Sequence, residues 1–398
     1  MFSALFQRER KPRLDTGYLL RVAADVRPRV RLRLIDQLAE LLANPRASAR
    51  ERADVQPVLL KLAMDMDRDV RAHLADRLKP VENLDAEIIY ALAGDEDAIA
   101  LPFLKEARAL RDATVQLAIC KAGDAARRKA ICARKDVSAE AARFVATRGE
   151  REALLTLLKN PHAPMWPALA RRLYARFNAD EEIVNLMLAR ADLPLEVRLA
   201  HVEVQAGRGA RAMNTPDWRA ARLAVNAVPD AREENIARVL GQAKSREELE
   251  IAFTFLTRRG RLTAAVLLQA ACAGHVFVLG HALAWLTQTR LSRVEKLFRP
   301  GASLALARTM LPRAGLPETT HALALAIILA AQGQNAAVMQ PNHKVEHMNR
   351  RILEVVASTD ALSVTEKIQV CNLLMQFTGE DTRKLAAKLA ESLIHHAA

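Results

Sequence analysis

Residues 67–75 read Asp-Arg-Asp-Val-Arg-Ala-His-Leu-Ala. Aspartate is favoured just before a helix, because its carboxylate accepts hydrogen bonds from the first free amide groups. Val70 and Leu74 lie one helical turn apart and share a face, so Arg71 emerges at the flank of the buried side. We predict that one of the two aspartates caps a helix beginning near Val70. We also predict that Arg71 bonds a neighbouring repeat rather than a ligand.

Similar pairs recur along the chain, at Val30-Arg31, Val115-Gln116 and Val197-Arg198. Their intervals suit a repeat of about 40–47 residues, and the stretch resembles the start of the second helix of a HEAT repeat. One helix pair can bury only one face, so neighbouring pairs must stack to form a core. The sequence therefore predicts an all-α fold, an α-solenoid of HEAT-like antiparallel helix pairs with a helical C-terminal region. The register of the repeat is lost between Asp124 and Asp192.

Composition and capping signals agree with this fold. Only 14 glycines and 16 prolines occur in 398 residues, too few turn residues for a β-rich chain. Four serine–glutamate pairs have the spacing of a capping box, in which each side chain bonds the backbone of the other residue. The pairs are Ser48–Glu51, Ser245–Glu248, Ser292–Glu295 and Ser363–Glu366.

Two breaks divide the predicted helices into three regions. Glycines at 207 and 209, followed by Pro216, form the stronger break, and residues 332–342 form the weaker one. We expect HEAT-like helical repeats over residues 1–206, a second helical region over 217–335 and C-terminal helices over 343–398.

Clusters of basic residues are the sequence features that most clearly suggest a binding site. The net charge is +13, which is compatible with nucleic acid, anionic lipid or an acidic protein partner. The candidate binding residues are Arg29, Arg31, Arg33, Arg127, Arg128, Lys129, Arg208 and Arg211. Aromatic residues make up only 4% of the chain, although binding of single-stranded nucleic acid by stacking needs them. Solvated helix faces are therefore the simpler interpretation of these clusters.

No motif for catalysis, a cofactor or a metal is found in the sequence. Phosphate-binding loops, nucleophile elbows and zinc-protease motifs are missing. His343 and His347 have helical spacing for zinc, but a third ligand is not evident, so a solvated helix face is favoured. His275 and His281 stand in apolar sequence and are expected to be core histidines. Four cysteines without CxxC spacing predict free buried thiols in a reducing cytoplasm.

One stretch is long enough to cross a membrane. Residues 262–289 contain no Asp, Glu, Lys or Arg. Gly274 and His275 divide the stretch into two shorter halves, which predicts two buried helices of a soluble core and no membrane span.

The C-terminal half resembles a known family. The residues that carry the resemblance are Arg261-Leu262-Thr263, Leu267-Leu268, Cys272-Ala273-Gly274, Leu291-Ser292-Arg293-Val294 and Arg313-Ala314-Gly315-Leu316-Pro317. They are similar to an alphaproteobacterial family of unknown function, of the DUF2336 type. The resemblance implies a helical-repeat fold in a bacterial cytoplasm, and it carries no catalytic residues.

These observations favour a non-catalytic scaffold or adaptor that binds another protein or a peptide, because solenoids usually present extended binding surfaces. The alternative is a HEAT-like protein that binds nucleic acid with a basic face.

Overall fold

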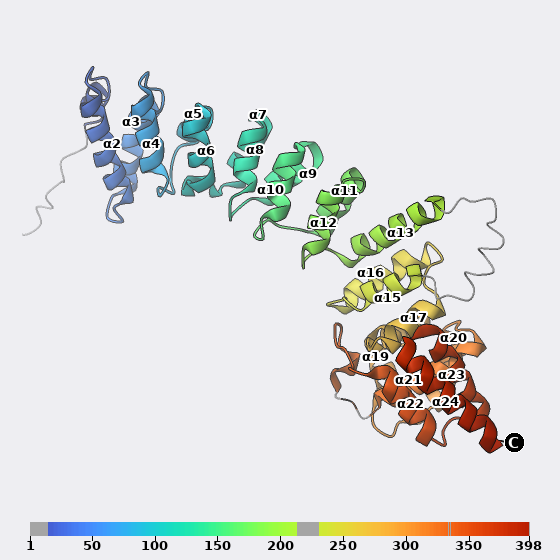
Figure 1. Cartoon of the computed structure of the whole chain (residues 1–398). Coiled ribbons are helices and arrows are strands. Elements are labelled where there is room, and N and C mark those ends of the chain that lie inside the picture. The colour runs from blue at the N-terminus through green and yellow to red at the C-terminus, as the bar shows by residue number, and fades with distance from the viewer. Residues whose placement is uncertain (1–14, 213–230, 333, 335, 398) are drawn as a thin grey trace, which may run out of the picture. The chain divides into compact units, whose positions relative to one another are not determined.

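The computed structural model describes residues 15–212, 231–332, 334 and 336–397, without the side chains of 208–212, 336 and 396–397. The described residues form helices and connecting loops, with no strand among them. Close contacts divide the chain into two compact units, residues 1–193 and 194–398. This confirms the predicted all-α fold, and the pairing of neighbouring helices is consistent with an α-solenoid (Figure 1).

The first unit consists of two layers of short helices. Odd-numbered helices pack on the next odd-numbered helix, and even-numbered helices do the same in the other layer (Figure 1). The odd layer contains α1 (Thr16–Val22), α3 (Ala49–Ala63), α5 (Ala86–Ala93), α7 (Ala113–Ala122), α9 (Ala139–Arg148) and α11 (Pro167–Phe177). The even layer contains α2 (Pro28–Ala43), α4 (Arg68–Leu78), α6 (Asp97–Glu106), α8 (Ala125–Cys132), α10 (Arg151–Lys159) and α12 (Glu181–Ala189). A short 3-10 helix, η1 (Arg108–Arg111), lies between α6 and α7.

The second unit contains the helices after Leu193. They are α13 (Leu195–Ala212), α15 (Ala231–Leu240), α16 (Arg246–Thr257), α17 (Ala264–Cys272), α18 (Val276–Leu286), α19 (Leu291–Val294), α20 (Ala305–Arg313), α21 (Glu318–Ala331), α22 (Met348–Ser358), α23 (Val364–Phe377) and α24 (Glu380–Ala397). Two 3-10 helices, η2 (Glu295–Phe298) and η3 (Ala336–Met339), connect them. Helices α17, α18 and α21 are buried over most of their length and form the centre of one apolar core.

The unit boundary lies before α13, because α13 packs on α15 and α16. The region expected from residue 343 onward also packs into the second unit, through contacts of α22 and α23 with α21. The three predicted domain ranges stay a prediction, since these contacts describe packing rather than independent folding.

The apolar stretch over 262–289 forms two helices, as predicted. Gly274 has a φ of +95° between α17 and α18, a conformation that favours glycine. The amides of Gly274 and His275 bond the carbonyls of Ala271 and Ala270, both at 2.9 Å, which closes α17 with a Schellman motif. Among the described residues, no helix is long and apolar enough to cross a membrane.

Of the four predicted capping boxes, those of Ser48 and Ser363 are complete. Ser245 accepts a bond from the amide of Glu248, whose carboxylate bonds the amide of Lys244 instead. The fourth prediction was wrong, because α19 begins at Leu291 and Ser292 already lies in its first turn.

The pairing of Val115-Gln116 with Val70-Arg71 was also wrong. Val115 and Gln116 lie in the odd layer on α7, whereas Val70 and Arg71 lie in the even layer on α4. Gln116 donates to the carbonyl of Asp136 at 2.9 Å and accepts from the amide of Ser138 at 2.7 Å.

Gln56 on α3, two odd-numbered helices earlier, makes the same two kinds of contact. It donates to the carbonyl of Asn83 at 3.3 Å and accepts from the amide of Asp85 at 3.2 Å. The structural counterpart of Val115-Gln116 is therefore Val55-Gln56, and each glutamine holds the loop that leads into the next odd-numbered helix.

A ladder of side chains connects the C-terminal ends of the even helices. Arg134, after α8, donates to the carbonyls of Leu104 and Ala107 at 2.7 and 2.9 Å, at the end of α6. Asn160, after α10, donates to the carbonyls of Cys132 and Arg134 at 2.9 and 2.6 Å.

Arg190 continues the ladder after α12. It donates to the carbonyls of Asn160 and Ala163 at 3.0 and 2.7 Å. Each of the three donors is at least nine-tenths buried, so the carbonyls that it bonds are shielded from water. We call Arg134, Asn160 and Arg190 the carbonyl ladder.

We predict that Arg134→Met destabilises the first unit while the neighbouring Lys135→Met does not. Methionine fills the space but removes the donor to the carbonyl of Leu104 and the shorter of two bonds to the carbonyl of Ala107, which also accepts from the amide of Leu110. A buried group that loses its donor costs roughly 1–3 kcal/mol. Lys135 is exposed, and its replacement should change the free energy of unfolding by less than about 0.5 kcal/mol. Urea unfolding followed by far-UV circular dichroism measures both. Equal midpoints for the two variants would contradict a structural role of the ladder.

Candidate binding groove

The three arginines of the first predicted basic cluster differ in their contacts: one bonds within the fold, and two are exposed. Arg31, on α2, donates to the carbonyl of Asp25 at 2.6 Å and pairs with Asp65 at 2.9 Å. Its side chain is only 11% exposed, so it holds the start of α2 to the loop before α4. Arg29 and Arg33 are exposed and make no ion pair with a described residue.

Arg71 repeats this arrangement on α4. It donates to the carbonyl of Asp65 at 2.9 Å and forms a two-point contact with the carboxylate of Asp95, at 2.7 and 3.0 Å. Asp67 caps α4 by accepting from the amide of Asp69 at 2.9 Å. The predicted cap is confirmed, and Arg71 bonds the loop of the neighbouring helix pair, as predicted.

The second basic cluster also bonds within the fold. Arg127 donates to the carbonyl of Ala93 at 2.7 Å and pairs with Asp97 and Asp124 at 3.1 and 2.8 Å. Arg71 from one side and Arg127 from the other thus converge on the loop between α5 and α6.

Arg128 and Lys129 differ in exposure. Arg128 is 15% exposed, donates to the carbonyl of Cys120 at 2.8 Å and pairs with Glu150 at 2.5 Å. Lys129 is 54% exposed and lies 3.6 Å from Glu152. Helix α13 extends through Arg208 and Arg211, whose side chains lie outside the described residues. A binding role for these eight residues stays a prediction, but three of them, Arg31, Arg127 and Arg128, already have structural partners.

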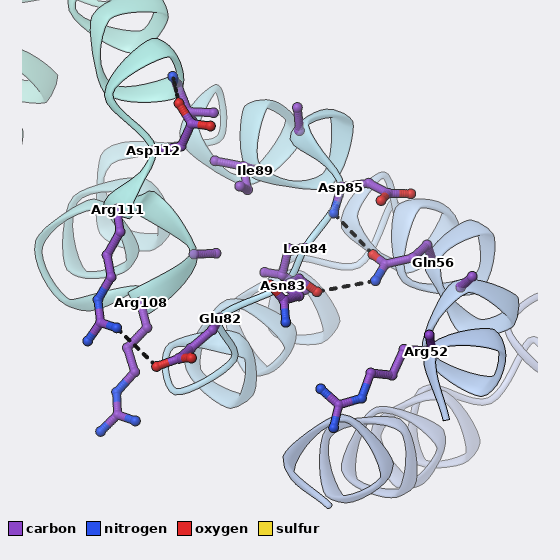
Figure 2. Close-up of a pocket in the computed structure, with 15 residues that line it drawn as sticks. Arg52, Gln56, Glu82, Asn83, Leu84, Asp85, Ile89, Arg108, Arg111 and Asp112 are labelled. Atoms are coloured by element: carbon purple, nitrogen blue, oxygen red, sulfur yellow. Dashed lines mark hydrogen bonds and ion pairs between the residues drawn. The ribbon is translucent and has the colours of Figure 1, made fainter. Parts of the chain in front are cut away.

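A pocket that the sequence does not predict opens at the N-terminal ends of the odd helices. Its volume is about 730 Å³, and we call it the N-terminal pocket (Figure 2). The lining comes from α3, the loop before α5, α5, η1 and α7: Ala49, Arg52, Ala53, Gln56, Glu82, Asn83, Leu84, Asp85, Ala86, Ile89, Arg108, Ala109, Arg111, Asp112 and Val115. Arg111 pairs with Glu82 at 3.1 Å, whereas exposed Arg108 makes no ion pair with a described residue.

A second pocket of about 600 Å³ lies at the C-terminal ends of α5 and α7. We call it the C-terminal pocket, and its lining is Tyr90, Ala93, Gly94, Ala118, Ile119, Ala122, Gly123, Asp124 and Arg127. The α5 residues that line the two pockets have the spacing of a single helix face. The same is true of the α7 residues. The two pockets therefore lie along the same faces of α5 and α7, and we call them together the α5–α7 groove.

The groove results from local sequence. Insertion of η1 between α6 and α7 separates α7 from the helix pair before it. The facing positions Ala93, Gly94, Ala118, Ala122 and Gly123 are too small to fill the gap. These small residues are the sequence signal from which the groove could have been predicted. Nothing in the sequence, however, shows that α5 and α7 face each other.

The chain is related to a bacterial family for which no activity is described. The family described as "Uncharacterised protein conserved in bacteria (DUF2336)" matches residues 99–364. The chain belongs to this family. No curated protein and no solved structure matches the chain significantly.

In this DUF2336 protein, the described histidines and cysteines do not form a metal site. No group of three His, Cys, Asp or Glu side chains that could hold a metal is found among the described residues. His343 and His347 precede α22 instead of sharing a helix face, because α22 begins at Met348 and His347 has a φ of +55°. The interpretation of the pair as one solvated helix face was therefore wrong.

The four cysteines of the DUF2336 protein are free and buried, as expected. Burial raises the pKa of the Cys120 and Cys272 thiols to about 12 and that of Cys371 to about 11. Burial also raises the pKa of Cys132. These thiols stay protonated near neutral pH, which makes them poor nucleophiles.

We predict that Arg71→Ala destabilises the protein near neutral pH and that the difference shrinks in acid. Burial of Asp95 opposes ionisation, but the bonds from Arg71 outweigh it and hold the pKa of Asp95 below its usual value. The pair's stabilisation, about 1.5–3 kcal/mol, is complete above the usual aspartate pKa of about 3.9. It is lost as the pH falls through the lower native pKa.

Urea unfolding at a series of pH values tests this, with Arg33→Ala as the control for removing an exposed arginine. The Arg33→Ala curve should follow the parent at every pH. A loss of stability by Arg71→Ala that persists unchanged in strong acid would show that the ion pair is not its cause.

Proposed function

We propose that this protein is a non-catalytic helical-repeat adaptor that binds a segment of another protein in the α5–α7 groove. The observation that carries the proposal is the pair of pockets along α5 and α7, of which the C-terminal one is mainly apolar and the N-terminal one is lined by charged side chains. At about 1.5 Å per residue, the ten residues of α7 provide a groove of roughly 15 Å, enough for a few turns of a helix or a short extended peptide.

The side chains that line the two pockets suggest which side chains the partner segment carries. Ala118, Ile119 and partly exposed Tyr90 offer apolar contacts in the C-terminal pocket. Arg108 offers an unpaired cation at the N-terminal pocket. A segment with apolar side chains followed by an acidic residue fits both ends.

We also propose that the repeats are HEAT-like and that the protein is cytoplasmic and alphaproteobacterial. The equivalent bonds of Arg31 and Arg71 to their own loop and to the next one support the HEAT-like assignment. Four buried thiols without a disulfide support a reducing compartment.

Nucleic-acid binding is the second candidate, supported by the net charge of +13. It has less support than protein binding, because Arg31, Arg127 and Arg128 bond carboxylates and carbonyls of the fold. Counterion release predicts that any such binding weakens steeply with salt.

We predict that Ala122→Tyr abolishes partner binding, because the ring fills the C-terminal pocket. Ala175→Tyr places the same ring at an exposed position of α11, outside the groove, and should bind like the parent. Quantitative affinity purification from the native cell, with all three proteins as bait, should identify a stoichiometric partner lost only from Ala122→Tyr.

Two outcomes contradict the proposal. One is that no stoichiometric protein is recovered under several growth conditions, and the other is that Ala122→Tyr retains the same partner. Salt-sensitive binding of duplex or single-stranded DNA by all three proteins would favour the second candidate instead.

A further inference from the structure

A third cavity is lined entirely by residues of the second unit and is independent of the α5–α7 groove. Its volume is about 670 Å³, within the range of small-molecule sites. Its lining comes from α15, α17, the α17–α18 turn, the start of α22, the end of α23 and α24. We call it the polar chamber.

Three buried polar atoms without a hydrogen-bond partner belong to side chains that line this chamber. They are Oε1 of Gln269, Nδ1 of His275 and Oδ1 of Asn349. Gln269 is only 6% exposed, so bulk water does not solvate its amide. Buried polar groups are nearly always bonded, and three residues with such exceptions line this one cavity.

Two comparable side chains elsewhere in the second unit, those of His281 and Gln332, have hydrogen-bond partners. Nε2 of His281 lies 3.1 Å from the carbonyl oxygen of Met339. Gln332 donates to the carbonyls of Leu297 and Ala302 at 2.9 and 3.0 Å. Oε1 of Glu203 and Nε of Arg351, which do not line the chamber, also lack a hydrogen-bond partner, but the polar chamber brings three such residues to one cavity.

The backbone holds His275 tightly at the chamber wall. The ring packs against Gly241, where any Cβ would collide with it. On the other side, Gly274 accepts a bond from the amide of Val345 at 2.9 Å, and a Cβ on Gly274 would meet the carbonyl of Val345. Burial, with a contribution from Lys344, lowers the pKa of His275, so the ring is neutral near neutral pH.

Cations surround the outer part of the chamber. Lys344 and Arg383 are exposed lining residues and make no ion pair with a described residue. Arg238 is paired with Glu234 at 3.0 Å. Two unpaired cations beside neutral hydrogen-bond acceptors give the site two chemically different parts.

We infer that the polar chamber binds a small organic anion whose uncharged end carries N–H or O–H donors, the class that includes nucleoside monophosphates. The donors meet Gln269, His275 and Asn349, and the anionic group meets Lys344 and Arg383. A cavity of about 670 Å³ has room for a base, a sugar and a phosphate together, whereas an amino acid would leave most of it unfilled.

Isothermal titration calorimetry with AMP, GMP, CMP and UMP at low salt tests the inference. At least one of them should bind the full-length protein. Gln269→Leu should weaken that binding at least tenfold without lowering the melting temperature, because leucine removes an unsatisfied polar group. Gln332→Leu is the matched control and should lower the melting temperature, since it breaks two hydrogen bonds, while affinity stays unchanged.

The anionic end has its own pair of variants. Arg383→Ala should weaken binding of the same nucleotide at least fivefold. The adjacent Lys384→Ala should not, because Lys384 pairs with Glu380 at 2.9 Å and does not line the chamber.

Several results would overturn the inference. They are no binding of any of the four nucleotides at millimolar concentration, equal affinity for inorganic phosphate alone, and nucleotide binding unaffected by Gln269→Leu. A lower melting temperature of Gln269→Leu without loss of binding would assign ordered water to the unsatisfied atoms instead.

Discussion

The first unit depends on how its helix ends satisfy their carbonyl groups. A helix leaves its last carbonyls without an intrahelical donor, and stacking removes water from those ends. Arg134, Asn160 and Arg190 each supply the missing donors one helix pair back. Because each donor stands at the end of one even helix and bonds the end of the preceding one, the ladder sets the spacing of successive pairs as well as their hydrogen bonding.

This constraint gives the arginines of this basic chain a structural role, separate from any role in binding a ligand. Arginine can bond several carbonyls or carboxylates at once through its planar guanidinium, which lysine cannot do. Arg31 and Arg71 close the other edge of the unit by bonding their own loop and the next one. Part of the positive charge is thus required for stacking, and net charge alone is weak support for a nucleic-acid partner.

The features that could be predicted from the sequence are those that depend on residues close together in the chain. Asp67, Val70 and Arg71 lie within two turns, so their cap, buried face and outward bond followed from spacing alone. The register failed after Asp124 because the carbonyl ladder replaces the Asp-Val-Arg signal there. The groove and the polar chamber join residues distant in sequence, such as Gln269 and Asn349, and only packing brings them together.

The two units differ in how completely they satisfy buried polar groups near their cavities. Around the N-terminal pocket, Gln56 bonds backbone on both sides of its amide, which leaves a rigid wall. Around the polar chamber, Gln269, His275 and Asn349 each retain an unbonded buried atom, and such groups cost about 1–3 kcal/mol apiece. A ligand that supplied donors there would remove this cost, so its binding would stabilise the second unit. If both proposals hold, the partner of the groove is selected by shape, whereas the ligand of the chamber is selected by the hydrogen bonds that it completes.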